Sequence, residues 1–244
     1  MRRLIGYIVA LAVILLGWLL TSLALNSPAL PTPFQTLPML QKFAPQLAPD
    51  FFISLYRVVA AMFLGTVIAM PIGLAVGRSQ RLDALLAPIL YILYPIPKIV
   101  LLPVLLVLLG LADAPKIVLI AITIFFQVLI TVRDAAKAVP DGAVLSVRSL
   151  GASRLDIFTH VVIPSSLPEL FTALRISSGT AVAILFFAEA IAGHTGLGYF
   201  IVDSWAMINY PRMFAGIILM ALLGVVLYEI FDFAERRLTR WRRN

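Results

Sequence analysis

Long, predominantly apolar runs of residues leave few folds open to this chain. Such runs cover residues 4–25, 51–76, 117–132, 170–192 and 214–233. The hydrocarbon core of a bilayer is about 30 Å thick, so a helix of roughly 20 apolar residues crosses it. Charged residues make up only 13% of the chain, whereas soluble domains carry roughly 25%. The sequence therefore predicts an all-α polytopic membrane protein with the lipid bilayer as its solvent.

Prolines mark both a broken span and a loop. Residues 26–50 hold too many prolines for a spanning helix and predict an external loop that can include a short helix lying at the membrane interface. Backbone groups freed by proline inside a span are tolerated only within a bundle or beside a water-filled path. We expect about six transmembrane helices, with residues 1–50 holding the first helix and its loop and residues 51–244 holding a core of five. The third of the six expected spans, residues 84–110, is interrupted by four prolines, Pro88, Pro95, Pro97 and Pro103.

The distribution of Lys and Arg orients these spans in the membrane. Thirteen basic residues fall in segments on one side, including the tail 235–244, against three on the other side, Lys42, Lys116 and Arg212. Basic residues accumulate on the cytoplasmic side of membrane proteins, so both termini are expected in the cytoplasm. This bias also explains the net charge of +7. Nucleic acid is not an expected partner, since no basic stripe with interleaved aromatic residues is present.

The longest polar interruption in the second half of the chain, residues 140–169, predicts a helix-turn-helix outside the bilayer. Val144, Val147 and Leu150 recur at helical spacing, and Gly151 follows where a left-handed residue ends a helix. One apolar face on a segment outside the lipid is typical of a helix that binds a groove on another protein.

A second short helix is expected directly after this turn. Ser153 and Asp156 have the spacing of a reciprocal cap at a helix start. Pro164 and Pro168 are expected to end this helix and to begin the next span.

These residues resemble the cytoplasmic loop of permease subunits of ABC importers. That loop has the form E-A-A, three residues, Gly, nine residues, Ile-x-Leu-Pro. Here Gly151 is followed by nine residues and then by 161–164, Val-Val-Ile-Pro. The run 148–154, R-S-L-G-A-S-R, is similar to the subfamily that imports nitrate, sulfonates, taurine or bicarbonate. The acidic position of the motif is filled by Leu145, so the family's polar contact is missing.

The resemblance implies a transport function and a set of partners. It implies a homodimer of permeases in a bacterial inner membrane, two cytoplasmic ABC ATPases and an extracytoplasmic substrate-binding protein. The chain has no G-x-x-x-x-G-K-[ST] signature, so it is not expected to be an enzyme, and ATP and Mg are expected in the partner. Within the coupling loop, 134–168, the residues expected to contact the ATPase are Val144, Leu145, Val147, Leu150, Gly151, Ala152 and Pro164.

Charges inside the spans are the candidates for the translocation path. An ionised side chain in hydrocarbon costs at least about 2.5 kcal/mol, so each needs a reason. Glu189 either lies on the path or its outer gate, or pairs with Arg57 or Lys98. Arg57, which with Ser54 resembles a Ser-x-x-Arg pattern of the same family, either attracts an anionic substrate or is a paired or snorkelling residue. Lys98 either lines the path or is a paired or interfacial lysine.

Residues 193–212 are too short to cross the membrane and return, and they predict an external re-entrant or interfacial helix. Gly196 and Gly198 lie at its start. They resemble a Gly-Leu-Gly segment of the importer family and either permit close backbone approach at a gate or dimer seam or simply form a turn. No metal site is expected, because the chain has no cysteine and its two histidines, His160 and His194, are far apart.

The function expected from these features is a transmembrane permease for a small anionic solute. The alternative is a proton-coupled secondary transporter, which would use more intramembrane acids and usually more helices. An integral membrane enzyme would need a polar catalytic cluster, and the sequence shows none.

Overall fold

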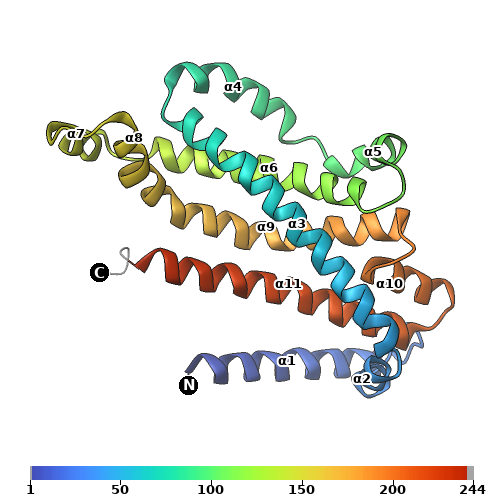
Figure 1. Cartoon of the computed structure of the whole chain (residues 1–244). Helices are drawn as coiled ribbons and strands as arrows, with labels where there is room; N and C mark the ends of the chain where they lie inside the picture. The colour runs from blue at the N-terminus through green and yellow to red at the C-terminus, as the bar shows by residue number, and fades with distance from the viewer. Residues whose placement is uncertain (1, 241–244) are drawn as a thin grey trace. The chain divides into compact units, whose positions relative to one another are not determined.

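The structure is a computed structural model, and it describes residues 2–240 (Figure 1). The part of the chain that it describes is helical and contains no strand, as the composition predicted. The helices are α1 (Arg2–Leu25), α2 (Pro33–Lys42), α3 (Ala44–Gly77), α4 (Gln80–Leu93), α5 (Leu102–Leu109), α6 (Ala114–Lys137), α7 (Asp141–Ser149), α8 (Arg154–Ile157), α9 (Ile163–Ala192), α10 (Leu197–Ala206) and α11 (Tyr210–Leu238).

Five of the described segments are long and apolar enough to cross a membrane. A sixth span arises if the bent pair of α4 and α5 counts as one crossing, since the two parts meet at 81°. The prediction of an all-α protein with about six spans is therefore confirmed. Its five continuous spans are Ile5–Leu25, Ala44–Gly77, Ala114–Lys137, Arg154–Ala192 and Tyr210–Leu238.

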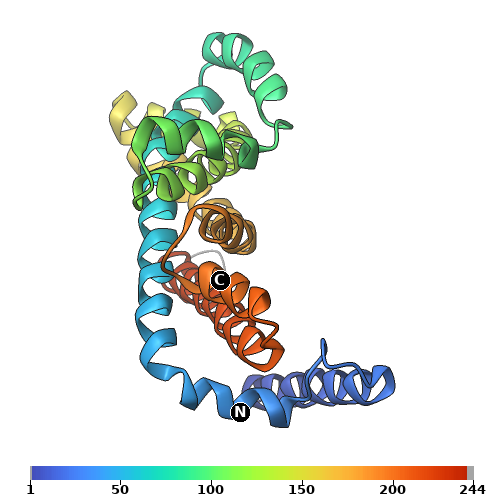
Figure 2. The same ribbon diagram turned by 90° about the vertical axis from the view of Figure 1, so that its right-hand side faces the viewer.

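The bend in the third span lies where the sequence places its prolines. The α4 helix ends at Leu93, and Pro97 caps the 3-10 turn Lys98–Leu101 that leads into α5. Proline has no N–H and cannot continue a helical ladder. The sharp turn between α4 and α5 is visible in Figure 2.

In two other places, helices form although they contain prolines. The second span begins at Ala44 rather than near residue 51, with Pro45 in its first turn and Pro49 further along the same helix. Proline near a helix start loses a donor that would have no partner anyway. The external loop also contains α2, which begins at a reciprocal cap between Thr32 and Gln35. The segment 26–50 therefore holds the short helix that its prediction allowed, whereas its residues from Ala44 onward belong to the second span.

The predicted helix break at Pro164 is wrong. The chain runs from α8 through a π-helical stretch, Phe158–Val162, directly into α9 without a break. A π-helical turn shifts the hydrogen-bond pattern by one residue and can absorb a missing donor inside a continuous helix. The coupling segment therefore joins its span through an unbroken helical connection.

The chain divides into two compact units, which are described separately. In the unit formed by residues 55–188 and 223–244, α3 and α6 approach closely through three glycines of α3, Gly65, Gly73 and Gly77. A Cβ at Gly65 or Gly73 would lie only 2.7 or 2.9 Å from a backbone oxygen of α6. Small residues permit such close helix packing in membranes, where helices gain nothing from hydrophobic association.

Ion pairs join helices within this same unit. Asp83 of α4 bonds Arg133 of α6 at 2.5 Å and Lys137 at 2.7 Å. Arg175 of α9 pairs with Asp232 of α11 at 2.9 Å. These pairs join α4 to α6 and α9 to α11, and each charged group has a partner where it would otherwise be costly to bury.

In the other unit, residues 1–54 and 189–222, α1 is fixed near its C-terminal end. Trp18 stacks on Phe214 with ring centroids 5.6 Å apart and donates to the Pro31 carbonyl at 2.9 Å. Ser22 donates to the Leu30 carbonyl at 2.6 Å. Most of α1 remains exposed, as only 6% of its apolar window is buried. The sequence predicted a domain boundary at residue 50, between the first helix with its loop and the core of five spans. The two compact units do not test that boundary, and it stays a prediction.

Candidate functional site

Glu189 lies fully buried near the end of α9, and its carboxylate binds the start of α10. One carboxylate oxygen accepts from the Gly198 N–H at 2.9 Å. The Ser54 hydroxyl lies 2.8 and 2.9 Å from the two carboxylate oxygens and accepts from the Leu197 N–H at 2.9 Å. First-turn amides of a helix have no acceptor within the helix and carry the positive end of its dipole. Glu189 and Ser54 therefore cap α10 from distant parts of the sequence.

Gly196, the N-cap residue of α10, fits this arrangement because it has no side chain. Its φ is +103°, in the region that favours glycine, and a Cβ there would overlap the Glu189 carboxylate. Its N–H donates to Asp50 Oδ1 at 2.7 Å. Gly198 supplies the amide that Glu189 binds. The two glycines and Glu189, singled out separately from the sequence, thus form one site at the start of the predicted external helix.

The other end of α10 is held by an arginine. Arg212 pairs with Asp203 of α10 at 2.9 Å. Its guanidinium also lies 4.5 Å from the ring centroid of Phe200 and 5.2 Å from that of Phe43. Cations over aromatic faces contribute about 0.5–2 kcal/mol each. The sequence identified Arg212 only as an external charge. Its place beside Pro211, Met213 and Phe214, at the start of an apolar run, was the signal that could have found this cluster.

Arg57 and Lys98 belong to the unit of residues 55–188 and 223–244, and each has local partners. Arg57 is 2% exposed, and its Nε donates to Asp113 at 2.8 Å, just before α6 begins. Lys98 donates to the carbonyls of Leu93 and Tyr94 at 2.7 and 2.6 Å. It therefore caps the end of α4, where cations are favoured. Both residues support the broken span, while their roles on the path and their predicted pairing with Glu189 stay predictions.

The predicted helix-turn-helix is present and is closed by the residues named for it. Gly151 has φ +88°, and its N–H and that of Ala152 donate to Arg148 and Val147, which is the bond pattern of a Schellman end. Ser153 and Asp156 then form a reciprocal cap: the Ser153 hydroxyl accepts from the Asp156 amide, and the Asp156 carboxylate accepts from the Ser153 amide. In Figure 1, α7 and α8 lie beyond the end of α6 and the start of α9.

The apolar residues of this segment divide into inward and outward sets. Val144 is only 7% exposed, whereas Leu150 is 87%, Leu155 72% and Leu145 59% exposed. Val147 is half-buried. The surface open to a partner is therefore formed by the leucines, and Val144 packs within the chain.

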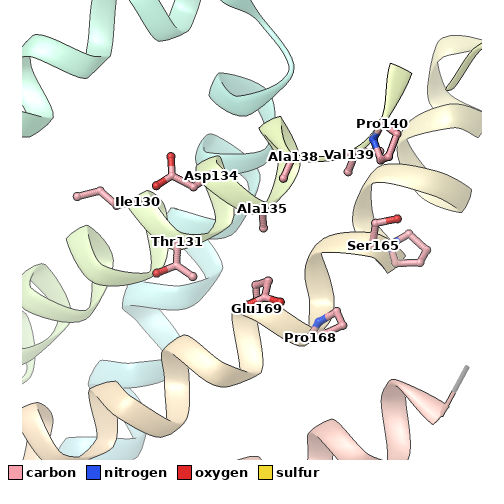
Figure 3. A pocket seen from close by; sticks show the side chains of 11 residues that line it. Ile130, Thr131, Asp134, Ala135, Ala138, Val139, Pro140, Ser165, Pro168 and Glu169 are labelled. Carbon is pink, nitrogen blue, oxygen red and sulfur yellow. The ribbon is translucent and has the colours of Figure 1, made fainter. Parts of the chain in front are cut away.

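A cavity of about 690 Å³ lies at the two points where the segment joins the spans. Its lining comes from residues 130–140 on one side and from residues 164–169 on the other. Figure 3 shows Thr131 and Ala135 of α6 on the side that faces α9, with Glu169 pointing toward them. These ranges coincide with the two ends of the predicted coupling loop, 134–168. A displacement of the loop would change the shape of this cavity.

The sequence is similar to known membrane transport proteins. The sequence model of the family described as "Binding-protein-dependent transport system inner membrane component" matches residues 61–240. The taurine transport system permease protein TauC of Escherichia coli K12 is 33% identical over 240 residues, which cover 95% of this chain and 87% of that protein. The nitrate import permease protein NrtB of Synechocystis sp. is 29% identical over 240 residues, covering 93% and 86%. The putative aliphatic sulfonates transport permease protein SsuC of Bacillus subtilis is 30% identical over 190 residues, covering 78% and 69%.

Solved structures show the same fold at lower sequence identity. A structure of inward-facing conformations of the MetNI methionine ABC transporter matches with a TM-score of 0.67 at 21% identity, covering 81% of this chain and 98% of that one. An amino acid ABC transporter with histidines matches with a TM-score of 0.61 at 20% identity, covering 84% and 97%.

Proposed function

The chain belongs to the family of binding-protein-dependent transport system inner membrane components, and from this premise we propose that it forms the translocation path for a small anionic solute. It is a multi-pass permease subunit of an ABC importer and not itself an ATPase. The cargo class rests on the relatives, which are named for taurine, aliphatic sulfonates and nitrate. These solutes share an oxyanion group, so bicarbonate also falls within the class.

The observation that carries the coupling mechanism is the exposure of the leucines in α7, in the turn that follows it and in α8. Partner ATPases must act on the spans from outside the lipid, and Leu150, Leu145 and Leu155 offer an apolar surface there. Burying an apolar side chain of this size contributes about 1.5–3 kcal/mol before ordering costs. Since Leu145 stands where relatives of this kind carry an acid, docking depends on apolar contact and shape.

The connection between this surface and the spans is short on both sides. The α7 helix follows α6 after three residues, and the π-helical stretch carries α8 into α9 without a break. Force on Leu150 is therefore transmitted to the helices that bound the 690 Å³ cavity. This gives ATP-driven movement a direct route into the membrane part of the protein.

On the outer side, α10 serves as the movable element at the mouth of the path. Its start is held by Glu189 and Ser54, and its end is held by Arg212. The helix also buries Leu197, Phe200 and Ile201, so its movement needs a partner that replaces both these apolar contacts and the polar ones. Docking of the external substrate-binding protein supplies such a partner.

The assembly follows from the same proposal. Two copies of the permease form the path, two ATPases bind ATP and Mg on the cytoplasmic side, and the binding protein delivers cargo outside. Both termini lie in the cytoplasm, as the distribution of Lys and Arg favours.

Uptake into proteoliposomes tests this function. The chain is reconstituted with its ATPase and binding protein, and uptake of radiolabelled taurine, ethanesulfonate and nitrate is measured with and without internal ATP. We expect ATP-dependent uptake of at least one of the three that a protonophore does not abolish. Uptake driven by a pH gradient without ATP would instead establish a proton-coupled secondary transporter.

A further inference from the structure

A second cavity lies within the helix-turn-helix itself and is bordered by three arginines. Its volume is about 260 Å³. Arg78 follows α3, Arg148 lies in the last turn of α7, and Arg154 opens α8. The remaining wall is apolar and consists of Val144, Ile157, Phe158 and Val162.

The positive charges around this cavity are poorly compensated. Arg78 donates to the Val139 carbonyl at 3.2 Å and lies 3.5 Å from Asp141, whose side chain is 90% exposed. Within residues 2–240, the guanidinium groups of Arg148 and Arg154 make no hydrogen bond or ion pair. The carboxylate of Asp156, the nearest acid along α8, is engaged by Ser153.

Guanidinium groups that converge on a concave site match the oxygens of phosphate, sulfate and sulfonate. Each can give two parallel N–H donors to one oxyanion, a geometry that ammonium groups do not offer. Three positive charges exclude a cation. The apolar wall excludes water from one side of the site and leaves room for a short alkyl chain.

We propose that this cavity binds a small oxyanion through Arg78, Arg148 and Arg154. The site is separate from the translocation path and stands on the cavity alone, whichever solute the permease carries. Because the three arginines come from three different elements, a bound oxyanion holds the end of α3, α7 and α8 in one arrangement. Binding therefore stiffens the segment through which we propose that the ATPase acts.

Hydrogen exchange on the full chain in phosphatidylcholine nanodiscs tests the site. Sodium sulfate is titrated against sodium chloride at constant ionic strength, and exchange is followed in residues 141–162. Sulfate should slow exchange in this segment in a saturable way, and chloride should not. Arg148→Gln and Arg154→Gln should each lose this protection. Arg81→Gln is the matched control, because Arg81 is exposed and does not line the cavity.

A second arm separates free anions from lipid headgroups, which share the phosphate chemistry. If nanodiscs containing phosphatidylglycerol protect the segment without sulfate, and the same two variants lose that protection, the occupant is a headgroup phosphate and the site stands.

Three results overturn the proposal. The first is sulfate protection that survives in the Arg148→Gln, Arg154→Gln double variant, and the second is an equal loss in Arg81→Gln. The third is the absence of any sulfate effect on the parent. If the double variant keeps sulfate protection but no longer co-purifies with the ATPase, the arginines serve the partner protein instead.

Discussion

Replacement of Glu189 by glutamine tests whether its carboxylate holds α10 in place. Glutamine has the same shape but presents one oxygen and one NH₂ group to a site that now offers donors from Ser54 and the Gly198 amide. One hydrogen bond to a charged acceptor is lost, which costs about 1.5–3 kcal/mol. The charge at the start of the helix is lost as well, at about 0.3–2 kcal/mol. Relief of the buried charge offsets part of this cost.

A net loss of about 2–3 kcal/mol corresponds to a change of about 30- to 150-fold in the opening equilibrium of α10. Hydrogen exchange of residues 197–206 in nanodiscs reports this equilibrium, because exchange follows the population of the open form. Ser54→Ala should accelerate exchange in the same segment, because the Leu197 amide loses its acceptor. Glu229→Gln, the same chemical change in α11, is the control and should leave α10 unchanged.

The result that refutes the reasoning is parental exchange of residues 197–206 in Glu189→Gln. If that variant also loses uptake while α10 stays protected, Glu189 acts on the path as a charge rather than as a cap. Loss of protection together with loss of uptake supports α10 as the gating element.

Three further variants examine the packing on which the account depends. Gly73→Ala should lower the Tm of the detergent-solubilised chain by forcing α3 away from a backbone oxygen of α6, whereas Gly179→Ala, which meets open space, should not. Arg212→Gln should speed exchange at the end of α10 by removing its ion pair and ring contacts. Asp83→Asn should lower the Tm and reduce the free energy of unfolding by on the order of 3 kcal/mol, which is the cost of breaking a buried pair, because Arg133 is only 6% exposed and loses its 2.5 Å partner; an unchanged Tm would contradict this.

Local rules predicted the turn at Gly151 correctly. The spacing of apolar residues, a glycine and a Ser–Asp pair depends only on neighbours in the sequence, and both the Schellman end and the reciprocal cap are present. Which side chains of this segment face inward was harder to predict from the sequence. Val144 and Leu150 are six residues apart, and Leu150 is the C-cap residue just beyond α7. Val144 therefore lines the 260 Å³ cavity, whereas Leu150 faces outward.

The Glu189 site also contains a contact between distant parts of the sequence that local patterns could not predict. The cost of a buried carboxylate identified Glu189 as a residue that needs a partner, and the two glycines were identified through their resemblance to a family motif. Their meeting with Ser54, 135 positions away along the chain, could not be predicted from spacing. The break expected at Pro164 failed for a local reason, because a π-helical turn absorbed the missing donor.

Coupled transport with Leu150→Asp tests most directly the claim that α7 and α8 carry the ATPase's action to the spans. The assembled transporter in proteoliposomes is assayed for ATP-dependent uptake, for ATPase stimulation by loaded binding protein and for ATPase co-purification. Leu150 is 87% exposed, so the charge should leave folding intact while placing an unpaired carboxylate in an apolar groove. Ser149→Asp, at the adjacent exposed position, is the matched control. We expect Leu150→Asp to abolish uptake and stimulation and Ser149→Asp to retain both. Parental uptake and ATPase binding in Leu150→Asp would contradict the account.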